Sequence, residues 1–81
     1  MVNLHDDGLS GSVDLTQLPE SLRVLFLGCN QLSGTVDLTQ LPQSLQKLNL
    51  DNNQFSGTVQ RSMLPPSLNL HTKHSGLNVV P

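Results

Sequence analysis

The sequence predicts a mainly β solenoid of about three coils, in which copies of one short unit stack along an axis. Three related segments begin at Gly11, Gly34 and Gly57 and read GSVDLTQLPESL, GTVDLTQLPQSL and GTVQRSMLPPSL. The glycines that open these segments are 23 residues apart in both intervals. A fixed period of this length is typical of stacked repeats, whereas a globular domain is built around one centre.

Each repeat contains a stretch whose apolar spacing predicts a short strand. Leu25 and Leu27 alternate with Val24, Phe26 and Gly28, and a period of two places alternate side chains on opposite faces. We expect the leucines to point inward and the residues between them to point outward. Stacked copies then place these strands side by side in a short parallel sheet, with neighbours about 4.8 Å apart.

The return path of each coil is predicted to consist of turns or short 3₁₀ segments. Gly34 follows Ser33 in a tight bend, where the lack of a Cβ permits a positive φ. Residues 36–38 (Val-Asp-Leu) alternate again, so we expect a second short strand on the outer side. Pro42 and Ser44 favour a turn before the next inner strand begins.

Two copies of the pattern L-x-x-L-x-L-x-x-N-x-L/F begin at Leu22 and Leu45. They resemble the leucine-rich-repeat family, and the resemblance covers roughly residues 1–70. The Ser-Gly-Thr-Val and Ser-Gly-Ser-Val segments are similar to repeats of plant-type receptors and protist surface proteins. The LPxSLxxL segments are similar, in second place, to the shorter repeats of bacterial effectors. The resemblance implies that the sheet is concave and that its concave face is the binding surface.

Asn30 and Asn53 occupy the bend that follows each predicted strand. Their side-chain amides can donate to and accept from backbone groups that the curved coil leaves unpaired. In leucine-rich-repeat proteins such asparagines form a ladder through successive coils, so the resemblance implies a structural ladder here. Asp7 holds the same position in the first coil, where an ionised carboxylate accepts hydrogen bonds but does not donate them.

The length of 81 residues allows at most one small domain. We expect the solenoid to cover residues 1–76 and a tail to follow over residues 77–81. Within the solenoid, the copies divide into a partial repeat (1–10), two repeats (11–33 and 34–56) and an eroded repeat (57–76). Met1 falls in the middle of a repeat, which favours a fragment of a larger protein.

The repeat pattern decays in the last copy. Arg61 stands where Leu15 and Leu38 stand in the earlier copies, which is a core position, so the turn there must differ.

The next segment also departs from the pattern. LNLHTKHSG, from Leu68, resembles LNLDNNQFSG, from Leu48, with deletions. On this alignment the ladder asparagine is lost, and Thr72 or Lys73 lies near its place. We therefore expect residues 71–81 to be irregular.

Composition excludes two classes of partner. The net charge is −2, only 12% of the residues are charged and no basic cluster is present, so we expect no nucleic acid. No apolar run approaches the roughly 20 residues that span a bilayer, so we expect no direct membrane insertion. No secretory signal is visible, and the compartment is left open. The resemblance implies a cell-surface or secreted parent protein as one option.

The predicted binding surface for a protein or peptide is the outward row of the sheet. It comprises Val24, Phe26, Gln31, Lys47, Asn49, Asp51 and Gln54. Phe26 beside Val24 is an apolar spot among amides, and an exposed aromatic residue is a suitable anchor for a partner. The alternative interpretation is that Phe26 is a tolerated surface residue or packs on Lys47.

No catalytic residue or cofactor is predicted. Cys29 stacks on Asp6 and lies diagonal to His5, which is the layout of an activated thiol. However, an open sheet excludes no water and offers no oxyanion site. We therefore expect no enzyme activity in this chain.

No metal site is predicted either. His71 and His74 form an H-x-x-H pair without an adjacent cysteine or acidic ligand, so we expect solvated histidines. Asp14 and Asp37 stack on the outer side, where solvated acids are favoured over a calcium bridge.

These observations favour a non-catalytic module that binds a protein or peptide, within a larger recognition or surface protein. Two alternatives stay open. The repeats could recognise substrates for a larger enzyme, of the receptor-kinase or ubiquitin-ligase type. They could also be a decayed repeat copy without function, since Arg61 and the shortened last repeat depart from the pattern.

Overall fold

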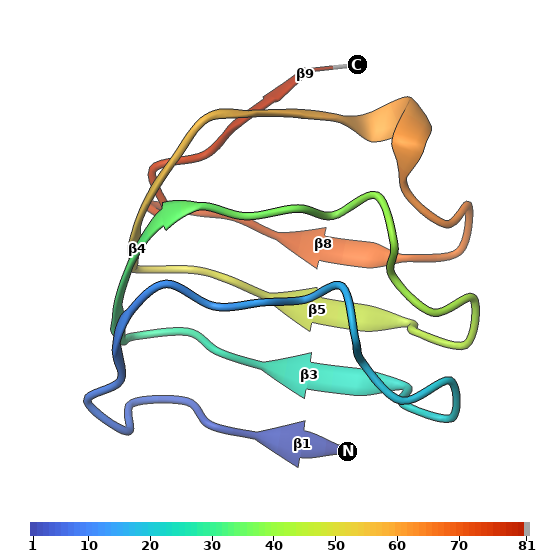
Figure 1. Ribbon diagram of the computed structural model, residues 1–81, viewed down its shortest axis with the longest axis horizontal. Helices are drawn as coiled ribbons and strands as arrows, with labels where there is room; N and C mark the ends of the chain where they lie inside the picture. The colour runs from blue at the N-terminus through green and yellow to red at the C-terminus, as the bar shows by residue number, and fades with distance from the viewer. Residues whose placement is uncertain (81) are drawn as a thin grey trace.

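The computed structural model describes residues 1–80, which form stacked parallel coils. The prediction of a mainly β solenoid is confirmed. Within the described residues the regular structure consists of short strands and one single-turn 3₁₀ helix, η1 (Arg61–Met63). The first and last strands, β1 and β9, lie at opposite ends of the stack (Figure 1).

The first sheet takes one strand from each of four coils. Its strands are β1 (Val2–Asn3), β3 (Val24–Phe26), β5 (Lys47–Asn49) and β8 (Asn69–His71), in that spatial order. All neighbours are parallel, and Leu25 pairs with Val2 on one side and Leu48 on the other. The 23-residue period therefore sets the register of β1, β3 and β5.

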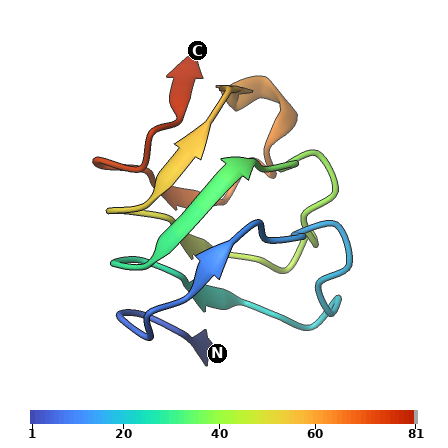
Figure 2. The same cartoon turned by 60° about the vertical axis from the view of Figure 1, so that its left-hand side comes forward.

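A second group of strands follows the bend at the end of the first sheet (Figure 2). β2 (Ser10–Gly11), β4 (Gln31–Thr35) and β6 (Gln54–Ser56) form a three-stranded parallel sheet. β7 (Thr58–Gln60) and β9 (Asn78–Val80) form a parallel pair at the end of the stack.

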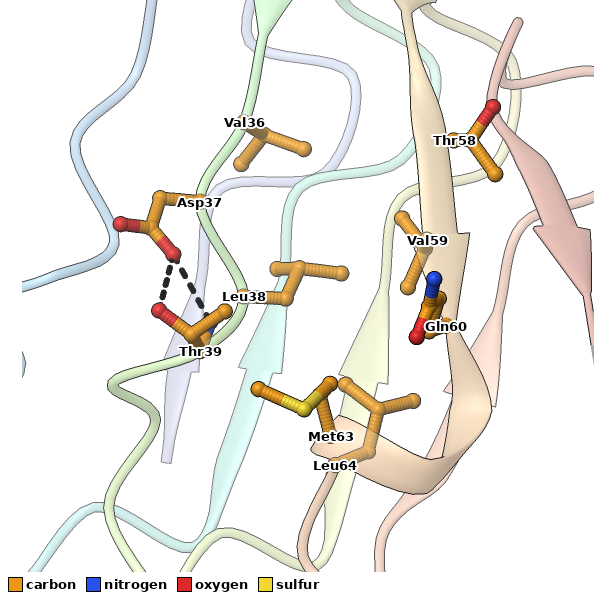
Figure 3. A pocket seen from close by; sticks show the side chains of 9 residues that line it. All are labelled: Val36, Asp37, Leu38, Thr39, Thr58, Val59, Gln60, Met63 and Leu64. Carbon is orange, nitrogen blue, oxygen red and sulfur yellow. Dashed lines mark hydrogen bonds between the residues drawn. The ribbon is translucent and has the colours of Figure 1, made fainter.

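The strand predicted at residues 36–38 is wrong, because β4 ends at Thr35. Asp37 supplies the physical reason. Its carboxylate Oδ1 accepts the backbone N–H of Thr39 at 2.8 Å, so this amide bonds within its own coil (Figure 3). A local turn of this kind competes with pairing to a neighbouring coil.

The core is a column of leucines shared by successive coils. Leu45, Leu48 and Leu50 are fully buried, and Leu25 and Leu27 stack beneath the latter two. Full burial of a leucine side chain stabilises the fold by about 1.5–3 kcal/mol relative to exposure. Each coil obtains this burial from the coils above and below it, as expected for a solenoid.

Asn30 joins the first two coils through backbone groups. Its Nδ2 donates to the carbonyl oxygen of Leu27 in its own coil at 2.9 Å and of Leu4 in the preceding coil at 3.0 Å. Its Oδ1 accepts the backbone N–H of Leu9 at 3.0 Å. The amide thus satisfies donors and acceptors of two coils at once.

Asn53 repeats the arrangement one coil later. Its Nδ2 donates to the carbonyl oxygens of Leu27 and Leu50 at 3.0 and 3.1 Å, and its Oδ1 accepts the N–H of Leu32 at 3.1 Å. Both asparagine side chains are buried. Loss of one partner would leave buried polar groups unpaired, at a cost of about 1–3 kcal/mol for each.

The alignment of the last coil predicted from the sequence is wrong. β8 pairs with β5 so that Leu70, not Leu68, lies beside Leu48. The Leu68 N–H bonds to the Pro65 carbonyl just as the Leu45 N–H bonds to that of Pro42. The last coil has therefore lost one residue between Leu68 and Leu70.

The corrected alignment places Ser75 at the ladder position, where Thr72 or Lys73 was expected. His74 has a φ of 55°, matching the 56° of Asn52 that precedes the ladder residue Asn53. Ser75 is fully buried, and its hydroxyl accepts the N–H of Leu77 at 3.2 Å. A short hydroxyl thus replaces the longer amide in the last coil.

The expectation that residues 71–81 are irregular is wrong for two of their segments. His71 belongs to β8, and residues 78–80 form β9 against β7. Leu77 and Val79 pack against the buried core, which explains why residues 77–80 are ordered. Pro81 lies outside the described residues.

The turn at Arg61 differs from its counterparts, as the sequence predicts. Leu15 and Leu38 are buried, whereas Arg61 is exposed at the start of η1. A hollow of about 300 Å³ lies beside this turn, and its lining includes Leu38, Val59 and Met63 (Figure 3). The charged side chain cannot fill the core position without desolvation, so the space stays open.

Two outer carboxylates are held in local turns. The hydroxyl and backbone N–H of Thr16 donate to Asp14 at 2.5 and 2.9 Å, and those of Thr39 donate to Asp37 at 2.5 and 2.8 Å. The hydroxyl bond first, and then the backbone bond, hold the pKa of each carboxyl below its usual value. Hydrogen bonds favour the ionised form because a carboxylate is the better acceptor.

Replacing Leu48 with alanine should destabilise the protein by about 2–5 kcal/mol, because the buried methyl groups are lost and a cavity remains. Urea unfolding followed by far-ultraviolet circular dichroism measures the change. Gln46→Ala, at an exposed neighbouring position, is the control and should leave the midpoint nearly unchanged. Equal midpoints for the two variants would show that Leu48 does not lie in the core.

Arg61→Leu should raise the free energy of unfolding by about 1 kcal/mol, because a partly buried leucine would fill the hollow. Arg61→Gln removes the same charge but adds no apolar volume, which makes it the matched control. Urea unfolding should separate the two variants. A glutamine variant as stable as the leucine variant would contradict the packing explanation.

Stability should fall as the pH drops below about 4, because the Asp14 and Asp37 carboxyls have a lower pKa in the folded chain than in the unfolded chain. Their contribution is complete above the unfolded pKa and is lost as the pH falls through the folded pKa. Thr16→Val with Thr39→Val should flatten this part of the pH dependence, measured by thermal unfolding between pH 2 and 7. Identical pH profiles for the variant and the original chain would show that the threonine hydrogen bonds do not cause the pH dependence of stability.

Candidate functional site

The outward face of the first sheet carries rows of side chains that run across the strands. The strand register places Val24 beside Lys47, and Lys47 beside Asn69. It forms a second row from Asn3, Phe26, Asn49 and His71. The leucines that alternate with these residues are buried on the opposite face of the sheet, and this packing fixes the strands that carry the outward side chains.

Phe26 lies at the centre of a shallow hollow on this face. The hollow has a volume of about 270 Å³ and is lined by Asn3, His5, Phe26 and Asn49. The Lys47 ammonium nitrogen is 5.8 Å from the centroid of the Phe26 ring, within the range of a cation–π interaction. The sequence-based alternative that Phe26 packs on Lys47 thus has structural support, and the same contact borders the hollow.

The two asparagines that flank Phe26 have fixed amide orientations. Asn3 Oδ1 accepts the backbone N–H of His5 at 3.1 Å, and Asn49 Oδ1 accepts that of Asp51 at 2.9 Å. Because a backbone N–H can only donate, the oxygen must face it, and the NH₂ group points away. Within residues 1–80, neither NH₂ group donates to another residue.

Gly28 brings the backbone close beneath the hollow. It is buried, and a Cβ added there would lie 2.9 Å from Asn49 Oδ1 and 3.0 Å from His5 Nδ1. The two side chains therefore rest over a position that has no room for a larger residue. A glycine at this point keeps the hollow open between neighbouring coils.

The structure brings together only part of the predicted surface. Val24, Phe26, Lys47 and Asn49 lie on the first sheet, whose face holds the hollow. Asp51 follows β5, and its Oδ1 accepts the backbone N–H of Lys73 at 2.7 Å. The remaining two predicted residues, Gln31 and Gln54, are exposed at the starts of β4 and β6 in the second sheet.

Sequence reasoning missed His71 as a member of this face. It extends the row of Asn49, and its Nε2 is buried without a hydrogen-bond partner among the described residues. The available signal was the match between the triplets Lys47-Leu48-Asn49 and Asn69-Leu70-His71. The alignment of Leu68 with Leu48 concealed this match, because it shifted the last coil by two residues.

Cys29 is half-buried at the end of the first sheet. The Asn52 Nδ2 donates to its Sγ at 3.6 Å. Among residues 1–80, no histidine or carboxylate hydrogen-bonds to the thiol. Cys29 also has a left-handed φ of 56°, as have Asp6 and Asn52 at the same point of the neighbouring coils.

Two further classes of site are absent from the described part of the chain. No three histidine, cysteine, aspartate or glutamate residues there lie close enough to hold a metal ion. Across residues 1–80, no helix has the length and apolar character needed to cross a membrane.

Comparison with known proteins gives one family match. A model described as Leucine Rich Repeat matches residues 44–70, which include β5, the ladder residue Asn53 and the first two residues of β8. No curated protein and no solved structure gives a significant match. The matched segment, the 23-residue period and the stacked parallel coils together support a leucine-rich-repeat protein.

Proposed function

We propose that the chain is a non-catalytic module that binds a protein or peptide on the outward face of the first sheet. Leucine-rich repeats generally serve as protein-binding modules and are generally non-catalytic. The observation that carries the proposal is the hollow at Phe26, where an aromatic ring is combined with two amide groups whose donors have no partner in residues 1–80.

The composition of this face suits a polypeptide ligand. An aromatic side chain such as Phe26 supplies apolar contact area, and buried aromatic anchors carry much of the energy of protein interfaces. The NH₂ groups of Asn3 and Asn49 can donate to the carbonyl oxygens of an extended peptide. The rows lie across parallel strands that are fixed from behind by buried leucines, so little side-chain and backbone entropy has to be lost on binding.

The similarity of the Ser-Gly-Thr-Val segments to repeats of receptors and surface proteins also supports a role in recognising a protein or peptide. Substrate recognition for a larger enzyme would use the same face and the same contacts. The decayed-copy alternative is less well supported, because the last coil keeps a buried ladder residue, Ser75, and a paired strand, β9, despite its lost residue.

A random-peptide display library panned against the chain tests the proposal. Selected peptides, titrated into ¹⁵N-labelled protein, should shift the amide resonances of Asn3, Phe26 and Asn49. Phe26→Ala should weaken their binding by about tenfold or more, since a central aromatic anchor is lost.

Met63→Ala is the matched control, because Met63 is an exposed apolar side chain beside the other hollow, with 56% of its surface exposed. Circular dichroism establishes that both variants are folded. The proposal fails if the library yields no binding peptide, if the shifts gather around Met63, or if Met63→Ala weakens binding as much as Phe26→Ala.

A further inference from the structure

We infer that the face around Phe26 selects acidic peptides, in which a carboxylate side chain lies next to an apolar one. The inference rests on the proposed binding function and adds the chemistry of the ligand. It follows from three features of this face: the hydrogen-bond donors of the hollow, the lysine beside the Phe26 ring and the direction in which charge changes along the strands.

The two asparagines of the hollow offer hydrogen-bond donors to a ligand. Asn3 and Asn49 each use the side-chain oxygen to accept a backbone N–H, so the groups left for a ligand are the NH₂ donors. The register places one donor on each side of Phe26. A ligand that fits between them must supply acceptor oxygens, and a carboxylate is the strongest acceptor that a peptide contains.

Lys47 adds a positive charge beside the hollow, next to Phe26. Its ammonium group lies over the Phe26 ring, and no carboxylate of residues 1–80 forms an ion pair with it. The ring contact holds the ammonium group beside the apolar surface of Phe26. A peptide carboxylate that pairs with Lys47 is thereby placed next to the ring, where the neighbouring apolar side chain can pack.

Charge along the strands gives the site a direction. Lys47 begins β5 and Arg23 directly precedes β3, so both cations lie where the strands start. Asp6 and Asp7 follow β1 and Asp51 follows β5, so three carboxylates and one cation, Lys73, lie where the strands end. One oxygen of Asp51 already accepts the Lys73 backbone N–H. An acidic ligand is attracted at the first end and repelled at the second, which favours one orientation of its carboxylate.

Val24 completes the apolar part of the surface. It lies beside Lys47 on the adjacent strand, precedes Phe26 by two residues and is half-buried. A branched or aromatic side chain of the ligand can therefore contact Val24 and Phe26 together. Because these apolar side chains lie next to Lys47, we expect a ligand that carries both a carboxylate and an adjacent apolar side chain.

The experiment uses peptides from the display selection that contain glutamate next to an apolar residue, each paired with its glutamine analogue. Affinities for the full chain are measured by fluorescence anisotropy at low salt. The glutamate peptides should bind about three- to tenfold more tightly than their glutamine analogues, as expected for a partly exposed charge pair with hydrogen bonds to amides. Salt at about 0.5 M should reduce this difference, because it screens exposed charges.

Lys47→Met removes the ammonium group but keeps an unbranched apolar side chain over the ring, so the glutamate preference should disappear. Lys73→Met makes the same change in net charge at an exposed position and should keep the preference. Glutamate and glutamine peptides that bind the original chain equally would overturn the acidic preference, while the proposed function would stand. Loss of the preference in both lysine variants would assign it to net charge and would also overturn the inference. A selection that yields no binding peptide would overturn both the inference and the proposed function.

Discussion

The mutual burial of leucines between successive coils is the constraint on which the rest of the structure depends. No coil within residues 1–80 contains enough apolar residues to enclose itself, so Leu25, Leu48 and Leu70 are covered by stacking in register. The asparagine ladder makes this stacking possible in the bends. Asn30 and Asn53 satisfy backbone groups of two coils, which would otherwise be buried without partners.

The same register determines the outward face. Since side chains alternate along a strand, fixing the leucines inward fixes Phe26 between Asn3 and Asn49 on the other side. The hollow therefore results from the repeat period together with Gly28, whose lack of a side chain leaves room for its neighbours. Substitution of outward-facing residues changes such a binding surface and leaves the leucine column intact. One scaffold can therefore bind ligands of different chemistry.

The sequence predicted the parts of the fold that depend on repetition. The strands around Leu25 and Leu48 follow from the two-residue alternation, and the departure at Arg61 follows from a charged residue in a leucine position. The last coil was misaligned because the letters LNL occur at both Leu48 and Leu68, whereas pairing between strands aligns Leu70 with Leu48. Hydrogen bonding and burial determine the register between strands. The sequence alignment used residue identity alone and therefore placed Leu68 beside Leu48.

The candidate site was predictable only in part, because the repeat pattern does not reveal the path of the bends or the orientation of side-chain amides. The period gave the neighbours of Phe26, but the bend after β3 and β5 carried Gln31 and Gln54 onto the second sheet. The orientation of the asparagine amides depends on two side-chain to backbone hydrogen bonds, at His5 and Asp51, that no pattern of residue types reveals.

Nuclear Overhauser effects between leucine methyl groups provide the most direct test of the stacked arrangement. In a sample with selectively labelled leucine methyls, the account predicts contacts between Leu25 and Leu48, between Leu48 and Leu70, and between Leu27 and Leu50. Methyl groups of Leu25 and Leu48 that contact only residues nearby in sequence, or only solvent, would contradict it.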